Sequence, residues 1–424
     1  MFGRFRLTLA ASMAAAALFI PVAIGHAAAV SPKPLHVVNL HAARDRALTT
    51  VPKHVPRAGI VPTRGTNPAR LARPAKSPAP ASCTEPNCNL IYNGGRVQHS
   101  PHVYLLFWGP EWSSSDPVLL HLVSFYQGLG TAGDNWSKVT SQYGDGTGHF
   151  TGATYGGAFR DTSPPPDPVD PVDLSAEADA LVQQFGLSAG AGNQVVVISQ
   201  SGTCFDDGFG GNCGTPQTEG YCAWHSYDGV VSYTNLPYQL DAGIGCGENF
   251  INSGSPGMLD GFSIVGGHEY AESITDPTAG GGWWDFSDPF GGEIGDKCVW
   301  GGIPFGTPDP DGNVHLSTGS FAMQSLWSNA AHKCVMTSDK LTLTHPPNMT
   351  TIKGRVVNYR MHAVSSTGSK MTWAITGQPT GLHITSGGLI TGRPTRVAVF
   401  HVKVTVHDAA GSSAVARWVW TIKR

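Results

Sequence analysis

The chain has 424 residues, enough for two or three domains, and its formal net charge of −3 hides three segments of alternating sign. Residues 31–82 carry a net charge of +8, residues 83–339 one of −23 and residues 340–424 one of +10. The acidic centre argues against nucleic-acid binding, which relies on basic surfaces. The alternation favours contacts between segments, cation binding or a charged surface partner.

The first 29 residues have the features of a secretory signal peptide. Arg4 and Arg6 precede the apolar stretch LTLAASMAAAALFIPVAIG, and alanines follow it at positions 27–29. We therefore predict cleavage near residue 29 and a secreted, extracellular protein, either released or associated with the cell wall. A retained membrane anchor is disfavoured because no second apolar span follows.

Residues 30–82 form a basic segment rich in Pro and Ala, without a sustained hydrophobic period. Such a segment buries too little apolar surface to offset its ordering entropy, so we expect no regular structure in it. Two roles fit this leader segment. It is either a disordered spacer or wall-associating stalk, or a propeptide whose positive charge docks on the acidic core.

Residues 83–338 read as one acidic domain of mixed helices and strands. VYLLFW at 103–108 and QVVVISQ at 194–200 are predicted strands, whereas the Gly- and Cys-rich stretch 201–257 is expected to be loop. Asp116 and Pro117 predict a helix start, and DPVDLSAEADALVQQFGL repeats that design. A third helix, LDGFSIVGGHEYAESITDP, ends at Pro277. The pattern predicts a disulfide-stabilised α+β domain.

Eight cysteines follow the signal segment, an even number that predicts disulfides in an oxidising compartment. Cys83 and Cys88 are close enough to close a local loop, and Cys298 with Cys334 is a second candidate pair. A zinc site of cysteines alone is disfavoured because the short CxxC spacings that it needs are absent.

Residues 339–424 alternate as β-strands do. HVKVTVHD turns Val402, Val404 and Val406 to one side, and ARWVWTIK does the same with Trp418 and Trp420, around the turn AAGSS. These runs predict a hairpin in an all-β sandwich. The stretch GLHITSGGLITGRPTRVAVFHVKVTVHDAAG resembles the immunoglobulin-like, cadherin-like module of secreted bacterial proteins. That resemblance implies a spacing, docking or binding role.

The stretch GGHEYAESITDP at 266–277 opens like the helix of a zinc peptidase. His268 and Glu272 are four residues apart, which places them on one face of a helix, with Glu269 beside them. In such peptidases two side chains hold the metal and the adjacent Glu takes a proton from water. Glu272 stands where a second histidine is usual. A carboxylate can bind zinc and also suits a harder cation, so calcium is a second possibility. The alternative is a polar pair on a solvated helix face.

Further candidates surround this helix. Glu293 lies 21 residues after Glu272, a separation at which zinc peptidases often supply a third carboxylate ligand, and Asp296 is the alternative third ligand or an orienting partner of His268. His225, in GYCAWHSYDG, is a candidate ligand or electrophile, with a structural histidine beside a disulfide as the alternative. The DPDG at 309–312 is a candidate calcium loop, although it lacks EF-hand spacing and favours a turn.

Four stretches together resemble the secreted phosphate-induced, EXORDIUM-like family of plants and its bacterial relatives. They are LIYNGGRV with VYLLFWGPEW, CAWHS, GGHEYAESITDP and EIGDKC, in the family's order. The resemblance groups His225, His268, Glu269, Glu272, Glu293 and Asp296 as positions that match family motifs. It implies a cell-wall or extracellular location and carries no settled biochemical activity. The basic leader and the C-terminal module depart from the plant pattern.

Two functions fit these observations. The first is a secreted, zincin-like metallohydrolase, most simply a peptidase acting on extracellular peptide, in which His268, Glu272 and Glu293 or Asp296 bind zinc and Glu269 is the general base. The second is a non-catalytic wall or matrix protein with a structural cation site and a β module that binds polymer or protein. A convergent site that opens to solvent favours the first, and a convergent but sealed site favours the second.

Overall fold

The computed structural model describes residues 34–54, 56–64, 89–206, 220–286, 288, 291–300, 310–338, 341–365, 370–408 and 413–424. The predicted signal peptide and the predicted Cys83–Cys88 pair lie outside these residues. No helix within the described ranges is long and apolar enough to cross a membrane.

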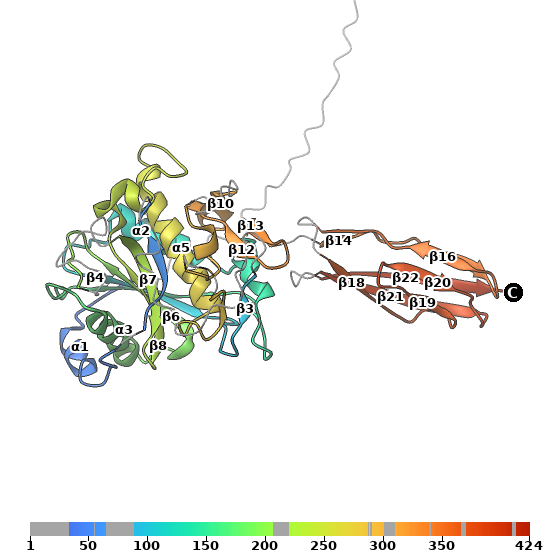
Figure 1. The fold of residues 1–424 in the computed structure, drawn as a ribbon, viewed down its shortest axis with the longest axis horizontal. Coiled ribbons are helices and arrows are strands. Elements are labelled where there is room, and N and C mark those ends of the chain that lie inside the picture. Colours follow the sequence, from blue (N-terminus) through green and yellow to red (C-terminus); the bar gives the residue numbers. More distant parts are fainter. Residues whose placement is uncertain are drawn as a thin grey trace, which may run out of the picture. The chain divides into compact units, whose positions relative to one another are not determined.

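The central domain is built on a seven-stranded sheet (Figure 1). Its first five strands run parallel, β7 is antiparallel to β8, and β2 is antiparallel to β7. The strands in spatial order are β1 (Leu35–Val38), β5 (Thr154–Asp161), β4 (His102–Trp108), β6 (Gly190–Ser199), β8 (Val231–Leu236), β7 (Tyr221–Tyr227) and β2 (Ala58–Pro62). Because parallel neighbours need crossover connections, the helices lie between strands in the chain and cover both faces. The layering is therefore α/β rather than the predicted α+β.

Helices form a layer on each face of this sheet. The core of one face joins α2 (Pro117–Gly128) and α5 (Asp260–Thr275) to alternate residues of β4 such as Phe107. The other core joins α3 (Pro171–Phe185) and the start of α1 (His41–Ala47) to the intervening residues, such as Trp108. Both predicted N-caps are confirmed. Asp116 accepts the N–H groups of the first turn of α2, and Asp170 forms a capping box with Asp173 in α3.

The leader segment contradicts the expectation of no regular structure. It contributes β1 and α1 at one end of the sheet and β2 at the other, and Leu40 and Val61 are fully buried. Its few apolar residues lack a pattern long enough to predict an element. They are buried because the sheet already offers two unpaired edges, a contact that local sequence does not encode.

The stretch 201–257, expected to be loop, holds two central strands. β7 and β8 pair with each other, and three 3₁₀ turns follow at Gln239–Asp241, Gly243–Cys246 and Gly257–Leu259. A disulfide joins Cys222 of β7 to Cys246. The predicted Cys298–Cys334 disulfide is confirmed, and Cys204 is also disulfide-bonded.

Small elements complete the domain around α5. They are the 3₁₀ helices Ser137–Gln142 and Asp296–Cys298, and the pairs β3 (Ile91–Tyr92) with β9 (Trp283–Trp284), β10 (Gly312–Leu316) with β11 (Gly319–Met323), and β12 (Leu326–Ser328) with β13 (Lys333–Val335). Asp309 of the candidate calcium loop lies outside the described residues. Asp311 of that loop accepts hydrogen bonds from the backbone N–H and the hydroxyl of Ser325.

The C-terminal residues form the predicted all-β unit. A four-stranded sheet and a three-stranded sheet enclose one core, in which Ile390 and Trp420 are completely buried. The predicted hairpin is β21 (Ala398–Asp408) with β22 (Ser413–Lys423). The other strands are β14 (Leu341–Leu343), β15 (Met349–Ile352), β16 (Val357–Arg360), β17 (Ala363–Ser365), β18 (Met371–Thr376), β19 (Leu382–Ile384) and β20 (Leu389–Gly392).

Candidate metal site

Helix α5 is buried over its whole length, which excludes the interpretation of a polar pair on a solvated face. Gly267 allows this burial, because a β-carbon there would lie 2.6 Å from the Met323 side chain of β11. The helix ends before Pro277, where the N–H of Asp276 still donates to the Glu272 carbonyl. The three polar side chains His268, Glu269 and Glu272 are therefore held inside the domain, each with 0% exposure.

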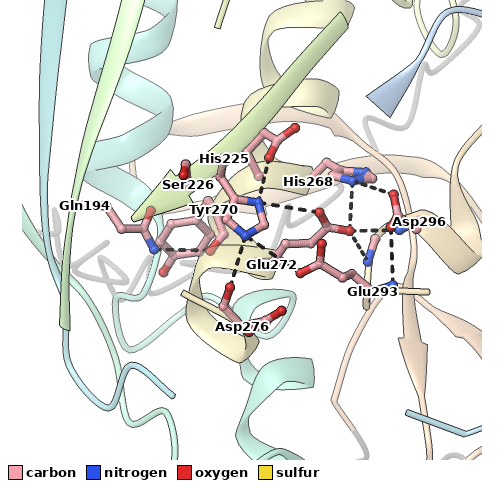
Figure 2. Close-up of polar contacts among 12 residues, drawn as sticks. Gln194, His225, Ser226, His268, Tyr270, Glu272, Asp276, Glu293 and Asp296 are labelled. Atoms are coloured by element: carbon pink, nitrogen blue, oxygen red, sulfur yellow. Dashed lines mark hydrogen bonds and ion pairs between the residues drawn. The ribbon is translucent and has the colours of Figure 1, made fainter. Parts of the chain in front are cut away.

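All six residues singled out from the sequence meet around this helix. Figure 2 labels five of them, His225, His268, Glu272, Glu293 and Asp296. Two groups of three can each offer ligand atoms lying within 4.8 Å of one another. The first group is His268, Glu272 and Asp296, and the second is His225, Glu269 and Glu272. Glu293 completes the set, with its Oε1 3.7 Å from His225 Nε2.

The first group is centred on His268 Nε2. Glu272 Oε1 lies 2.9 Å from this nitrogen and Asp296 Oδ1 lies 3.5 Å from it. The other ring nitrogen, Nδ1, lies 3.0 Å from Gln324 Oε1, while Gln324 Nε2 donates to the Gly295 carbonyl. Because the amide oxygen of Gln324 is an acceptor, Nδ1 carries the hydrogen and a neutral ring presents a lone pair at Nε2.

The second group repeats this arrangement on strand β7. His225 Nε2 donates to the Asp276 carbonyl at 3.1 Å, so a neutral ring presents its Nδ1 lone pair to the carboxylates. Glu269 Oε2 lies 3.1 Å from Nδ1 and Glu272 Oε2 lies 3.8 Å from it. In both groups an imidazole lone pair faces carboxylate oxygens, an arrangement that requires a proton or a cation between them.

Glu272 lies between the two groups and is oriented by the backbone. Its Oε1 accepts the N–H groups of Gly295 and Asp296 at 3.0 and 2.9 Å, and its Oε2 has no hydrogen-bond partner. Other atoms that lack a partner are His268 Nε2, Glu269 Oε1, Asp296 Oδ1 and both carboxylate oxygens of Glu293. Buried polar atoms are nearly always hydrogen-bonded, so a cluster without partners indicates a site for a ligand.

Burial and neighbouring charges shift the pKa values of the carboxyl groups and histidines in the cluster. Burial raises the pKa of Glu269 and of Glu293 well above the usual value, and burial together with Asp296 raises the pKa of Glu272 to about 7. Burial lowers the pKa of His225 to about 4. For His268 burial acts to lower the pKa, but Glu272 and the neighbouring carboxylates raise it well above its ordinary value.

The nearby lysine is paired outside this cluster. Lys297 Nζ lies 2.9 Å from Asp285 and 3.1 Å from Asp288, and it stands over the Trp327 ring. Within the described residues, the ion-pair partners of the four carboxylates are histidines. Asp285 and Asp288, two further acids of the same stretch, therefore form ion pairs with this lysine.

Two further residues contribute to the site, although neither belongs to a motif that the sequence alone reveals. Gln324 orients His268, and its only local signal is a polar residue directly after the apolar strand β11. Gly59 of β2 packs against the second group: a β-carbon there would lie 2.1 Å from Glu272 Oε2 and 2.4 Å from His225 Nδ1. The φ angle of Gly59 is +58°, which also favours glycine. No local signal in the leader predicted this contact.

Comparison with known proteins identifies the C-terminal unit alone. Residues 340–423 match the family described as "Putative Ig domain", which supports an immunoglobulin-like β module of the kind that binds protein or polymer. No curated protein matches the chain. Neither comparison gives support for the EXORDIUM-like or zincin-like resemblance of the central domain.

Solved structures with some likeness include a titin domain and a cadherin segment. The titin M3 domain is 18% identical over 21% of this chain and all of that chain, with a TM-score of 0.17. Mouse cadherin-23 EC22-24 is 12% identical over 24% of this chain and 33% of that chain, with a TM-score of 0.18. A "putative alpha-galactosidase" of Bacteroides fragilis is 21% identical, with a TM-score of 0.17 and 20% of this chain covered. The match spans only 17% of that protein's length.

Proposed function

We propose that the central domain is a divalent-cation-dependent hydrolase, a zincin-like peptidase that acts outside the cell. One observation carries the proposal: two imidazole lone pairs and four buried carboxylates face one another, and within the described residues no lysine or arginine is paired with them. Mixed nitrogen and oxygen ligands suit zinc, and the excess of carboxylates also accommodates a harder cation such as calcium.

On this proposal each residue of the cluster has its own role. His268, Glu272 and Asp296 would hold the cation, with Gln324 fixing the His268 ring and Glu293 close by. A bound divalent cation supplies Lewis acidity and favours ionisation of water. Glu269 would act as general base, because its Oε1 accepts no hydrogen bond and is free to take a proton.

The complete burial of the site favours the second candidate, a structural cation site in a wall or matrix protein. None of the site's histidine or glutamate side chains is exposed, and Asp296 is only 2% exposed. A peptide substrate cannot reach these atoms while the domain has this form. The immunoglobulin-like module fits this candidate as a polymer- or protein-binding unit.

The leader segment offers a way to reconcile burial with catalysis. We propose that residues 34–64 act as a propeptide, since β2 pairs with the sheet edge at β7 and Gly59 covers the second group. Elsewhere the leader is held by Arg44, whose Nη1 lies 3.8 Å from the buried Glu177 and whose guanidinium stacks on Trp108. Removal of this segment would uncover one side of the cluster.

The test is hydrolysis of a peptide library by the purified secreted chain, with metal content measured in parallel. A site-specific protease sequence placed between residue 64 and residue 89 allows the leader to be cut after folding. We expect hydrolysis after cutting, its loss in Glu269→Gln with metal retained, and loss of metal in Glu272→Ala. The matched control is Glu111→Gln, an exposed carboxylate of the same domain.

Two outcomes would overturn the hydrolase. The first is a folded wild-type protein that contains no metal, which would contradict the proposed metal site. Bound metal without hydrolysis, before and after the cut, assigns the cluster to a structural cation.

A further inference from the structure

We propose that the cluster binds two divalent cations, with Glu272 as the ligand common to both. This inference rests on the proposed function and deepens it: the second ion belongs to the group of His225, Glu269 and Glu272. From the sequence, Glu272 was expected to bind a single metal, with Glu269 as general base and His225 as a ligand or electrophile.

The geometry supplies a separate set of ligand atoms for each ion. The first set is His268 Nε2, Glu272 Oε1 and Asp296 Oδ1, and the second is His225 Nδ1, Glu269 Oε2 and Glu272 Oε2. The two carboxylate oxygens of Glu272 point to different histidines (Figure 2). A carboxylate placed in this way can bridge two ions.

Each imidazole has its own orienting partner. His268 Nδ1 donates to Gln324, and His225 Nε2 donates to the Asp276 carbonyl. Histidines that bind metal usually donate their second N–H to such an acceptor, which fixes the ring and its tautomer. Both rings are oriented in this way, including that of His225, which a site for a single metal does not need.

Charge points to the same number of ions. Glu269, Glu272, Glu293 and Asp296 carry four negative charges when ionised, and two neutral histidines add none. Two divalent cations balance these charges in full, whereas one ion leaves two carboxyl groups that the protein interior must keep protonated. Glu293 has no hydrogen bond to either carboxylate oxygen and is completely buried, and its Oε1 lies 3.7 Å from His225 Nε2, so its charge belongs to the same cluster.

The two sets also leave a role for Glu269. Binding through Oε2 keeps Oε1, which has no hydrogen-bond partner, available to accept a proton. The second ion is therefore compatible with the general base proposed above.

The experiment is metal stoichiometry of the full-length secreted chain, stripped with chelator and reloaded with Zn²⁺ alone. We expect two equivalents for the wild type, one for His225→Gln and one for His268→Gln, with His149→Gln as an exposed control that keeps two. Reloading with Mn²⁺ provides a second readout, because two Mn²⁺ ions sharing a carboxylate give an exchange-coupled electron paramagnetic resonance spectrum and an isolated ion does not. His225→Gln is expected to show the isolated-ion spectrum.

The possible failures are distinguishable. One equivalent in the wild type, with an isolated Mn²⁺ spectrum, overturns the second site and leaves the proposed single-metal function standing. No bound metal in a folded wild type overturns both. If a histidine variant does not fold, as judged by circular dichroism, the wild-type stoichiometry and the Mn²⁺ spectrum still decide the question.

Discussion

Removal of metal should weaken the central domain far more than the immunoglobulin-like unit. Six side-chain atoms of five residues in the cluster are buried without a hydrogen-bond partner. An unpartnered buried polar atom costs about 1–3 kcal/mol, so the six together cost on the order of 6–18 kcal/mol. A domain is stable by only about 5–15 kcal/mol, so the metal-free fold cannot hold them all charged and without hydrogen bonds.

The expected change in melting temperature can be estimated from the free energy of metal binding. A free ion concentration of roughly 1,000 times the dissociation constant stabilises the folded state by about 4 kcal/mol. For a domain of this size each kcal/mol moves the melting temperature by about 2–4 °C. Zinc should therefore raise the melting temperature of the central domain by about 8–16 °C over chelator-treated protein.

Differential scanning calorimetry of the stripped and the reloaded chain measures this shift. The transition of the immunoglobulin-like unit serves as an internal control and should not move. Equal melting temperatures of the central domain in chelator, zinc and calcium would refute the reasoning, and would mean that protons alone neutralise the cluster.

Three further predictions test the scaffold. Burial and Asp228 raise the pKa of Asp179 to about 8 from an ordinary value of 3.8. The stability it contributes is complete below pH 3.8 and is lost as the pH rises through 8. In denaturant unfolding, the stability of Asp179→Asn should therefore fall less steeply than that of wild type as the pH rises between those limits. Cys334→Ser opens a disulfide with a sequence separation of 36 and should cost about 2–4 kcal/mol by the same assay; an unchanged midpoint would contradict this. Ile390→Ala should destabilise the immunoglobulin-like unit by about 2–5 kcal/mol, whereas Val364→Ala, at a side chain 65% exposed, should stay within about 0.5 kcal/mol; equal effects would argue against the observed core.

Local sequence determined the elements whose signals are short-range. The starts of α2 and α3 could be predicted because Asp followed by Pro satisfies the first N–H groups of a helix from within a few residues. The β21–β22 hairpin could be predicted because alternation with period 2 assigns one face to the core. The candidate residues were also found locally, since His268, Glu269 and Glu272 stand on one stretch of helix.

Only the tertiary structure decided which side chains meet. His225 reaches the helix because β7 lies beside α5 in space, 44 residues from Glu269 in the chain. Gly59 reaches it because the leader pairs with the free edge of β7, and Gln324 because β11 packs on α5. Such contacts depend on the burial of long-range partners, so period and propensity do not encode them. The sequence therefore specified which chemical groups form the cluster. The packing of distant strands determined that the cluster is buried, that it divides into two groups, and that the leader segment covers it.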